Sequence, residues 1–120
     1  VAFGHDCVMD PWYSLGSADM LEVAAMGLHV AQMTSQDAMR RCFAAVTTNA
    51  AKVMHLERYG LDVGCDASFV LLQARDPIEA IRLRATRLKV FRRGNVIAES
   101  APTVATLAVD GRASQVTWMQ

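Results

Sequence analysis

The stretch that decides the fold is residues 1–12, which read Val1-Ala2-Phe3-Gly4-His5-Asp6-Cys7-Val8-Met9-Asp10-Pro11-Trp12. The apolar run over residues 1–5 predicts a buried strand, and the carboxylate of Asp6 follows at its C-terminal tip. Barrel enzymes present their catalytic groups at the C-terminal ends of strands. Because this strand opens at Val1 with no initiator methionine and no preceding cap, we expect the chain to be the C-terminal piece of a larger enzyme.

Size and charge define the class of protein. The chain has 120 residues, of which 52% are hydrophobic and 20% charged, so it is long enough for one globular domain with one core. Twelve basic and twelve acidic residues cancel, which argues against a nucleic-acid partner. We interpret the arginines of residues 82–93 as a solvated surface. No apolar run approaches the ~18 residues that span a bilayer, so we expect no membrane partner.

The three cysteines are widely spaced and form no Cys-x-x-Cys pair. This usage suits a reducing compartment and predicts a cytoplasmic protein with neither a disulfide scaffold nor a structural zinc site.

Local patterns then change from helical to strand-like along the chain. Helical spacing and caps predict four helices, at residues 18–33 with Ser17 as cap, 36–46 with Ser35 as cap, 47–56 before a terminator at Gly60, and 76–83. Short apolar runs predict strands at residues 67–72, 88–91, 96–98 and 103–109, with a hairpin turn at 92–95 and a tail at the end. The natural division lies near residues 60–64.

Asp6 is the residue with the clearest chemistry. A carboxylate among apolar residues is costly to ionise unless a cation or hydrogen bonds compensate, and a divalent metal does so. A metal lowers the pKa of bound water, and a neighbouring carboxylate can take and return the proton. The alternative is an aspartate that accepts backbone hydrogen bonds at the loop start. Strand alternation turns His5 to the opposite side, where we expect it to support the loop.

Other candidate side chains have weaker signals. Cys7 is expected to form a pocket wall rather than a nucleophile, because the adjacent acid disfavours a thiolate. Trp12 either stacks on a planar ring or anchors its loop in the core. We expect His29 to be a hydrogen-bonded core histidine and His55 to be exposed near a helix end. No histidine has a partner at metal-ligand spacing, so no metal site can be completed from this chain.

The opening motif resembles a known family. Gly4-His5-Asp6-x-Val8-x-Asp10-Pro11-Trp12-Tyr13-x-Leu15-Gly16 is similar to bacterial cytosine deaminases of the amidohydrolase superfamily, and residues 67–72 and 94–97 continue the match. The resemblance implies an α/β fold: the C-terminal part of a metal-dependent hydrolase (β/α)8 TIM barrel, then part of a small β-sandwich. Residues 1–60 would be the last barrel strand and C-terminal helices, and residues 61–120 would be sandwich strands.

The resemblance also implies an activity for the full-length enzyme. Asp6 would bind one divalent metal ion, iron or zinc, and shuttle a proton, while Trp12 lines the substrate pocket with Cys7 beside it. The enzyme would hydrolyse cytosine, or a related heterocycle, to uracil and ammonia, and we expect it to form a homo-oligomer. The family's other ligands, a His-x-His pair and two later histidines, and its catalytic glutamate are absent here. We therefore expect this chain alone to be inactive and to bind no metal tightly.

One departure from the family affects specificity. A second aspartate usually follows the catalytic one, and here Cys7 stands in its place. The change removes a charge and a hydrogen-bond acceptor beside the ring, so we predict altered ring specificity, with isoguanine, creatinine or a triazine as alternative substrates. A non-catalytic helical interaction module is the alternative from a different class.

Overall fold

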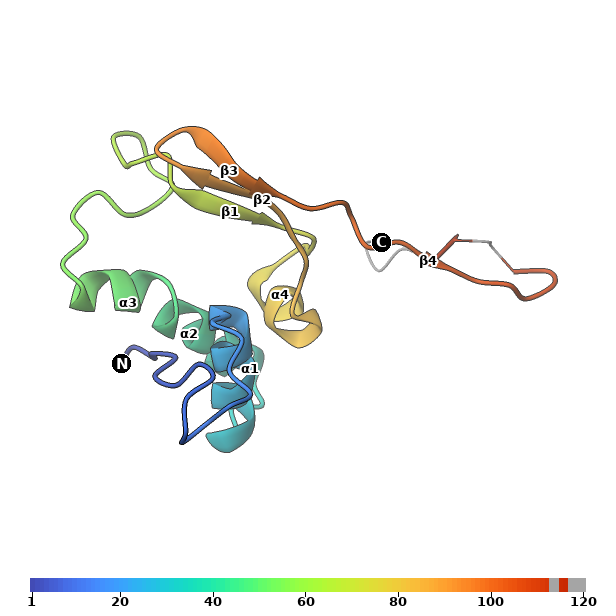
Figure 1. Ribbon diagram of the computed structural model, residues 1–120, viewed down its shortest axis with the longest axis horizontal. Helices are drawn as coiled ribbons and strands as arrows, with labels where there is room; N and C mark the ends of the chain where they lie inside the picture. Colours follow the sequence, from blue (N-terminus) through green and yellow to red (C-terminus); the bar gives the residue numbers. More distant parts are fainter. Residues whose placement is uncertain (113–114, 117–120) are drawn as a thin grey trace.

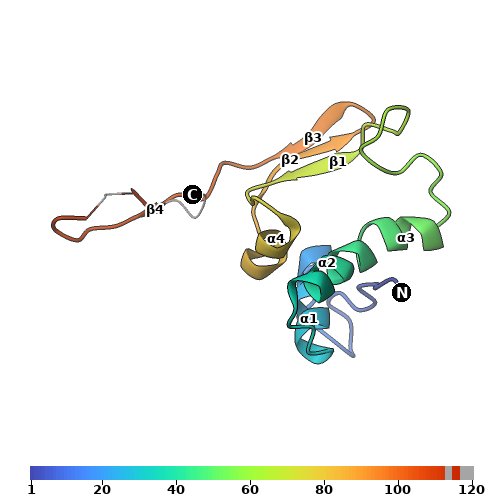
Figure 2. The ribbon, with the colours of Figure 1, turned by 180° about the vertical axis from the view of Figure 1, so that it is seen from behind.

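The fold combines a cluster of helices with an antiparallel sheet (Figure 1). The computed structural model describes residues 1–112 and 115–116. The helices are α1 (Met20–Val30), α2 (Gln36–Ala45), α3 (Thr48–Val53) and α4 (Pro77–Leu83). The strands are β1 (Phe69–Leu72), β2 (Arg87–Arg92), β3 (Asn95–Glu99), β4 (Ala105–Thr106) and β5 (Gln115–Val116). Seen from behind, α4 lies below one end of the sheet and next to α1 and α2, and the β4 segment projects away from the helices and the sheet (Figure 2).

Helix α1 begins two residues later than predicted. Asp19, not Ser17, is the N-cap: its Oδ1 accepts the Leu21 N–H at 2.7 Å. The Ser17 hydroxyl instead donates to the carboxylate of Glu22. A carboxylate gains more than a hydroxyl from the positive end of the helix dipole, which explains why the cap moves to Asp19.

Helices α2 and α3 follow each other across a short break at residues 46–47, and both end earlier than predicted. Ser35 caps α2 as predicted, with its Oγ accepting the Ala38 N–H at 3.2 Å. Helix α3 ends well before Gly60, so that predicted terminator is wrong. His55 takes the left-handed conformation (φ 54°), and the Leu56 N–H donates to the Ala51 carbonyl at 3.0 Å. These features form a Schellman motif without glycine.

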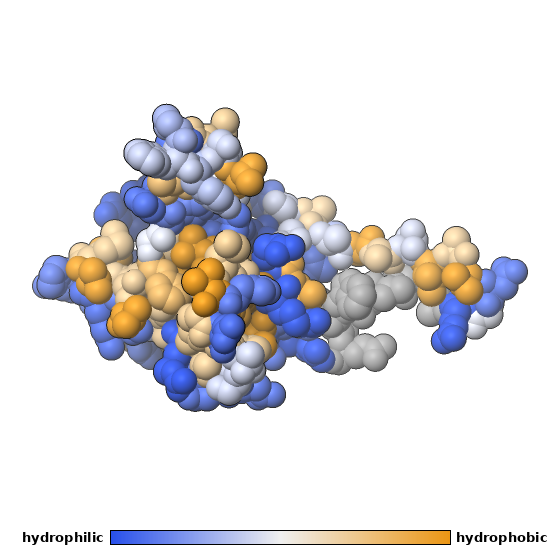
Figure 3. Space-filling model, turned by 90° about the horizontal axis from the view of Figure 1, so that it is seen from below, coloured by the Kyte–Doolittle hydropathy of each residue, from blue (hydrophilic) through white to orange (hydrophobic). Residues whose placement is uncertain are grey.

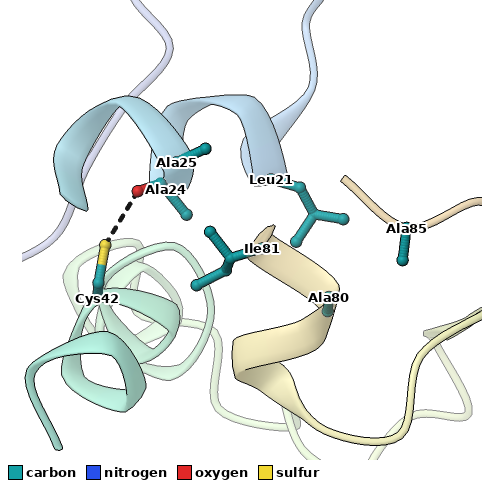
Figure 4. Close-up of a cluster of buried hydrophobic side chains, with 7 residues drawn as sticks. All are labelled: Leu21, Ala24, Ala25, Cys42, Ala80, Ile81 and Ala85. Carbon is teal, nitrogen blue, oxygen red and sulfur yellow. Dashed lines mark hydrogen bonds between the residues drawn. The ribbon is translucent and has the colours of Figure 1, made fainter. Parts of the chain in front are cut away.

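The core lies where α1, α2 and α4 meet (Figure 4). It consists mostly of small side chains, namely Leu21, Ala24, Ala25, Cys42, Ala80, Ile81 and Ala85. Ile81 is 1% exposed and points between α1 and α2. The Cys42 thiol donates to the Ala24 carbonyl at 3.2 Å, which the close approach of the two helices permits.

Helix α4 and the sheet follow local sequence rules. Asp76 caps α4 by accepting the Glu79 N–H at 2.9 Å, with Pro77 at the first position. The sheet order is β1-β2-β3, and Phe69 of β1 stacks on Phe91 of β2 with ring centroids 4.6 Å apart. The β2–β3 turn has positive φ at Arg93 and Gly94, as the predicted hairpin requires.

Residues 1–5 do not form the predicted strand. They are joined to the helices by two hydrogen bonds, from the Phe3 N–H to the Ala45 carbonyl at 3.0 Å and from the Asn49 side-chain amide to the Val1 carbonyl at 3.0 Å, and the Phe3 ring packs against the core. A strand needs lateral pairing, and none of the described strands pairs with this segment. The described residues are therefore a mixed α/β unit, and both the barrel strand and the division into residues 1–60 and 61–120 stay predictions.

The helical end of the molecule exposes apolar surface. Met26 and Val30 on α1 are 53% and 79% exposed, in agreement with the apolar pattern of that helix. Figure 3, which faces the helices, shows hydrophobic residues at the surface among hydrophilic ones. None of the helices in the described part of the chain has the length and apolar character needed to cross a membrane. The predicted strand at 103–109 is reduced to β4. The final residues, predicted as a tail, include β5, which pairs with β4, and their positions 113–114 and 117–120 lie outside the described residues.

Candidate active-site loop

The backbone around Asp6 forms a tight turn. The Cys7 N–H donates to the His5 carbonyl at 2.9 Å, so the hydrogen bond spans Asp6 alone. Asp6 has φ 61°, which is the central conformation of a γ-turn with positive φ. This conformation is strained for most residues, and strained backbone clusters at functional sites. The Asp6 side chain is exposed at this turn.

The His5 ring supports the same turn, as the sequence predicted. Its Nδ1 lies 3.0 Å from the Cys7 carbonyl oxygen, and its Nε2 is buried with no hydrogen-bond partner among the described residues. Gly16 packs against this pair. A Cβ at Gly16 would lie 2.7 Å from Cε1 of His5 and closer still to the Cys7 oxygen.

Asp10 closes the second half of the loop. Its Oδ1 accepts the backbone N–H groups of Trp12 at 2.9 Å and Tyr13 at 3.1 Å. A hydrogen bond from the Cys7 thiol, together with these amides, holds the pKa of Asp10 below its usual value. Asp10 thus has the backbone-accepting role that the sequence offered as an alternative for Asp6. The Asp-Pro turn signal could have identified it.

Cys7 is a half-buried thiol in an acidic setting. Its hydrogen bond to Asp10, its burial and the charges of Asp10 and Asp6 raise the pKa of the Cys7 thiol to about 11. The thiol is therefore protonated at neutral pH, so it is a poor nucleophile and presents a neutral surface next to Asp6.

The remaining candidates lie at the surface. Trp12 is 92% exposed, so it does not anchor the loop in the core that the described residues form. His29 is exposed rather than part of the core, although its Nδ1 lies 2.6 Å from the Ala25 carbonyl oxygen. His55 is exposed at the end of α3, as predicted.

The loop fits a partial metal site. Asp6 presents an exposed carboxylate, and carboxylate oxygen is a ligand for divalent ions. Within residues 1–112 and 115–116, no three His, Cys, Asp or Glu side chains come together as a metal site. An ion held by Asp6 therefore requires further ligands from outside the described residues.

Comparisons with known proteins identify relatives that match most of this chain. The model of the Amidohydrolase family matches residues 1–113. The crystal structure of 5-methylcytosine deaminase from Klebsiella pneumoniae liganded with 5-fluorocytosine is similar, with a TM-score of 0.80 and 34% identity, over 92% of this chain and 27% of that chain. N-isopropylammelide isopropylaminohydrolase from Burkholderia multivorans ATCC 17616 has a TM-score of 0.73 and 34% identity, over 77% and 24% of the two chains.

A curated relative agrees with these structures. N-isopropylammelide isopropyl amidohydrolase from Pseudomonas sp. (strain ADP) is 29% identical over 101 residues, which cover 83% of this chain and 25% of the relative. The chain thus spans about a quarter of the length of the relatives it matches. From the family match over residues 1–113, the chain belongs to the amidohydrolase family, hydrolases that act on carbon–nitrogen bonds and typically depend on a metal.

Proposed function

We propose that this chain carries the metal-binding and proton-transferring aspartate, Asp6, of an aminohydrolase that deaminates cytosine or a close analogue. The observation that supports this most strongly is the exposed Asp6 carboxylate on a γ-turn fixed by its neighbours. Membership of a family that hydrolyses carbon–nitrogen bonds supplies the reaction type. The similar Klebsiella deaminase is liganded with 5-fluorocytosine, which supports a pyrimidine substrate.

The proposed fold makes this unit one part of a larger enzyme. Residues 1–60 would contribute the last barrel strand and the helices after it, and residues 61–120 would contribute sandwich strands. Two observations support the assignment. Residues 1–4 are apolar, and the segment 1–5 pairs with no described strand. Helix α1 leaves Met26 and Val30 exposed, as a helix that covers further protein would.

The proposed chemistry uses Asp6 as a proton carrier. A bound divalent ion lowers the pKa of water towards neutrality. Asp6 would take the proton from the attacking water as the water oxygen bonds to the ring carbon that bears the amine, and the electron pair of that carbon's double bond would move onto the ring nitrogen. Asp6 would then return the proton to the amine nitrogen; the pair on the ring nitrogen re-forms the double bond as the bond to the amine breaks, ammonia leaves, and the hydroxypyrimidine that remains tautomerises to uracil. The products are uracil and ammonia.

Cys7 and Trp12 are proposed to contact the ring. The exposed indole of Trp12 offers a flat apolar surface for a planar heterocycle. The protonated Cys7 thiol offers a weak donor where a carboxylate would be a strong acceptor. Substrates that need no acceptor there are therefore favoured. N-isopropylammelide, the substrate named for two of the relatives, is the second candidate, ahead of isoguanine and creatinine.

The test is ammonia release by the protein expressed from its complete gene. We expect turnover of cytosine or N-isopropylammelide, and a loss of about a thousandfold in kcat in an Asp6→Asn variant. Asp62→Asn, an exposed aspartate outside the loop, serves as the control and should retain full activity. Full activity in Asp6→Asn would contradict the proposal.

A further inference from the structure

We propose that His5 is the positioning residue of Asp6, and that it acts through a single ring tautomer with the proton on Nδ1. The expected effect of His5 on turnover rests on the proposed function, whereas the hydrogen bonds between His5 and Cys7 do not depend on it. His5 contacts neither the Asp6 carboxylate nor a substrate. It acts on the peptide that follows Asp6.

Both backbone groups of Cys7 are bound by His5. The Cys7 N–H donates to the His5 carbonyl at 2.9 Å, and the Cys7 carbonyl lies 3.0 Å from the His5 ring Nδ1. The Asp6 residue between them has φ 61°, a positive φ that few non-glycine residues adopt, aspartate more often than most. Two bonds from one residue therefore hold the turn that sets the direction of the Asp6 side chain.

Gly16 makes this arrangement possible. A Cβ at Gly16 would lie 2.7 Å from Cε1 of His5 and would overlap the Cys7 carbonyl oxygen. Gly4, one residue before His5, has open space where its Cβ would stand. Of these two glycines, only Gly16 stands where a side chain would collide with the hydrogen-bonded His5 and Cys7.

The hydrogen bond determines the tautomer. A carbonyl oxygen only accepts, so Nδ1 must carry the proton. With the proton on Nε2 instead, two acceptors would face each other across 3.0 Å. The buried Nε2 would also hold an N–H with no acceptor among the described residues.

Two amide side chains separate the roles of the ring nitrogens. The Asn amide nitrogen stands at the same distance along the side chain as Nδ1, so His5→Asn keeps a donor for the Cys7 carbonyl. The Gln amide reaches the position of Nε2, so His5→Gln loses that donor while remaining polar. The pair is matched in chemistry and differs only in reach.

The first experiment uses the 120-residue chain at about pH 8. Nitrogen NMR of the His5 ring should show a protonated Nδ1 and an unprotonated Nε2. Hydrogen exchange of the Cys7 amide should be unchanged in His5→Asn and about fivefold faster in His5→Gln, the effect of one lost hydrogen bond. A proton on Nε2 in the native chain overturns the proposal, and so does equal exchange in both variants. If His5→Gln does not fold, the ring spectrum of the native chain decides.

The second experiment uses the protein expressed from its complete gene. His5→Gln should lower kcat at least about tenfold with unchanged KM and metal content, and His5→Asn should restore most of it. A change in KM alone, or equal loss in both variants, would contradict positioning of Asp6. Absence of activity in the native protein would refute the proposed function and leave the tautomer result standing.

Discussion

Replacing Asp19 tests how the helices are joined to the sheet. Asp19 caps α1 through the Leu21 N–H, and its two carboxylate oxygens also bind the guanidinium of Arg87, 68 residues away on β2. The Nη1–Oδ2 distance is 2.8 Å. This carboxylate thus joins the start of α1 to the middle strand of the sheet.

The two roles can be assigned separate magnitudes. Loss of an N-cap costs about 1 kcal/mol. The Asp19 and Arg87 side chains are 22% and 38% exposed, so solvent screening limits their pair to about 1 kcal/mol. Asp19→Ala should therefore lower the free energy of unfolding by about 2 kcal/mol, and Asp19→Ser, which keeps a cap, by about 1 kcal/mol. For 120 residues these values correspond to Tm shifts of about 8 and 4 °C.

The assay is urea unfolding of the 120-residue chain at neutral pH, followed by circular dichroism. Asp62→Ala, at an exposed loop position, is the control and should change stability by less than about 0.5 kcal/mol. In an Arg87→Ala background, Asp19→Ser should cost almost nothing further. Equal losses for Asp19→Ala and Asp19→Ser would refute the capping role, and an undiminished loss in the Arg87→Ala background would refute the ion pair.

Three further predictions concern the loop, acid stability and specificity. Gly16→Ala should lower the free energy of unfolding in urea by about 1–3 kcal/mol, because the added Cβ overpacks the contact with His5 and Cys7. Gly4→Ala, where the Cβ has open space, should lower it by less than about 0.5 kcal/mol, and equal losses in the two variants would exclude the close contact at Gly16. Hydrogen bonds from the Arg75 N–H and guanidinium lower the pKa of Glu79 in the folded chain. The ionised Glu79 therefore stabilises the fold at pH values above its unfolded-state pKa of about 4.3, and this stabilisation is lost as the pH falls through its lower folded-state pKa. Glu79→Gln should flatten the acid limb of the stability curve, and parallel curves would count against this. Cys7→Asp should shift the ratio of cytosine to N-isopropylammelide turnover towards cytosine, and an unchanged ratio would rule out Cys7 as a determinant.

Elements governed by neighbouring residues were predictable from the sequence. Ser35 and Asp76 cap their helices, and the turn at residues 92–95 forms, because each depends on groups within a few positions. The choice of Asp19 over Ser17 as the cap of α1 has a local part, the helix dipole, and a part that the neighbouring residues do not reveal, because Arg87 binds the Asp19 carboxylate from 68 residues away. The strand predicted at residues 1–5 has no partner among the described strands, and it stays a prediction because strand pairing depends on a second strand.

In the candidate site, too, residue types could be selected from the sequence, whereas the contacts between them could not. Asp6, Cys7 and Trp12 could be selected by residue type and position, and their roles at the site stay proposals. The bond from the His5 ring to the Cys7 carbonyl required the structure, because it depends on the rotation of a side chain and on the missing Cβ of Gly16.

The most direct test of the central claim is the metal content of the protein expressed from its complete gene. Elemental analysis of native protein and of Asp62→Asn should give about one divalent ion per chain, and Asp6→Asn should lose most of it. Full metal occupancy in Asp6→Asn would show that the Asp6 carboxylate is not a ligand, and the proposed mechanism would then be wrong.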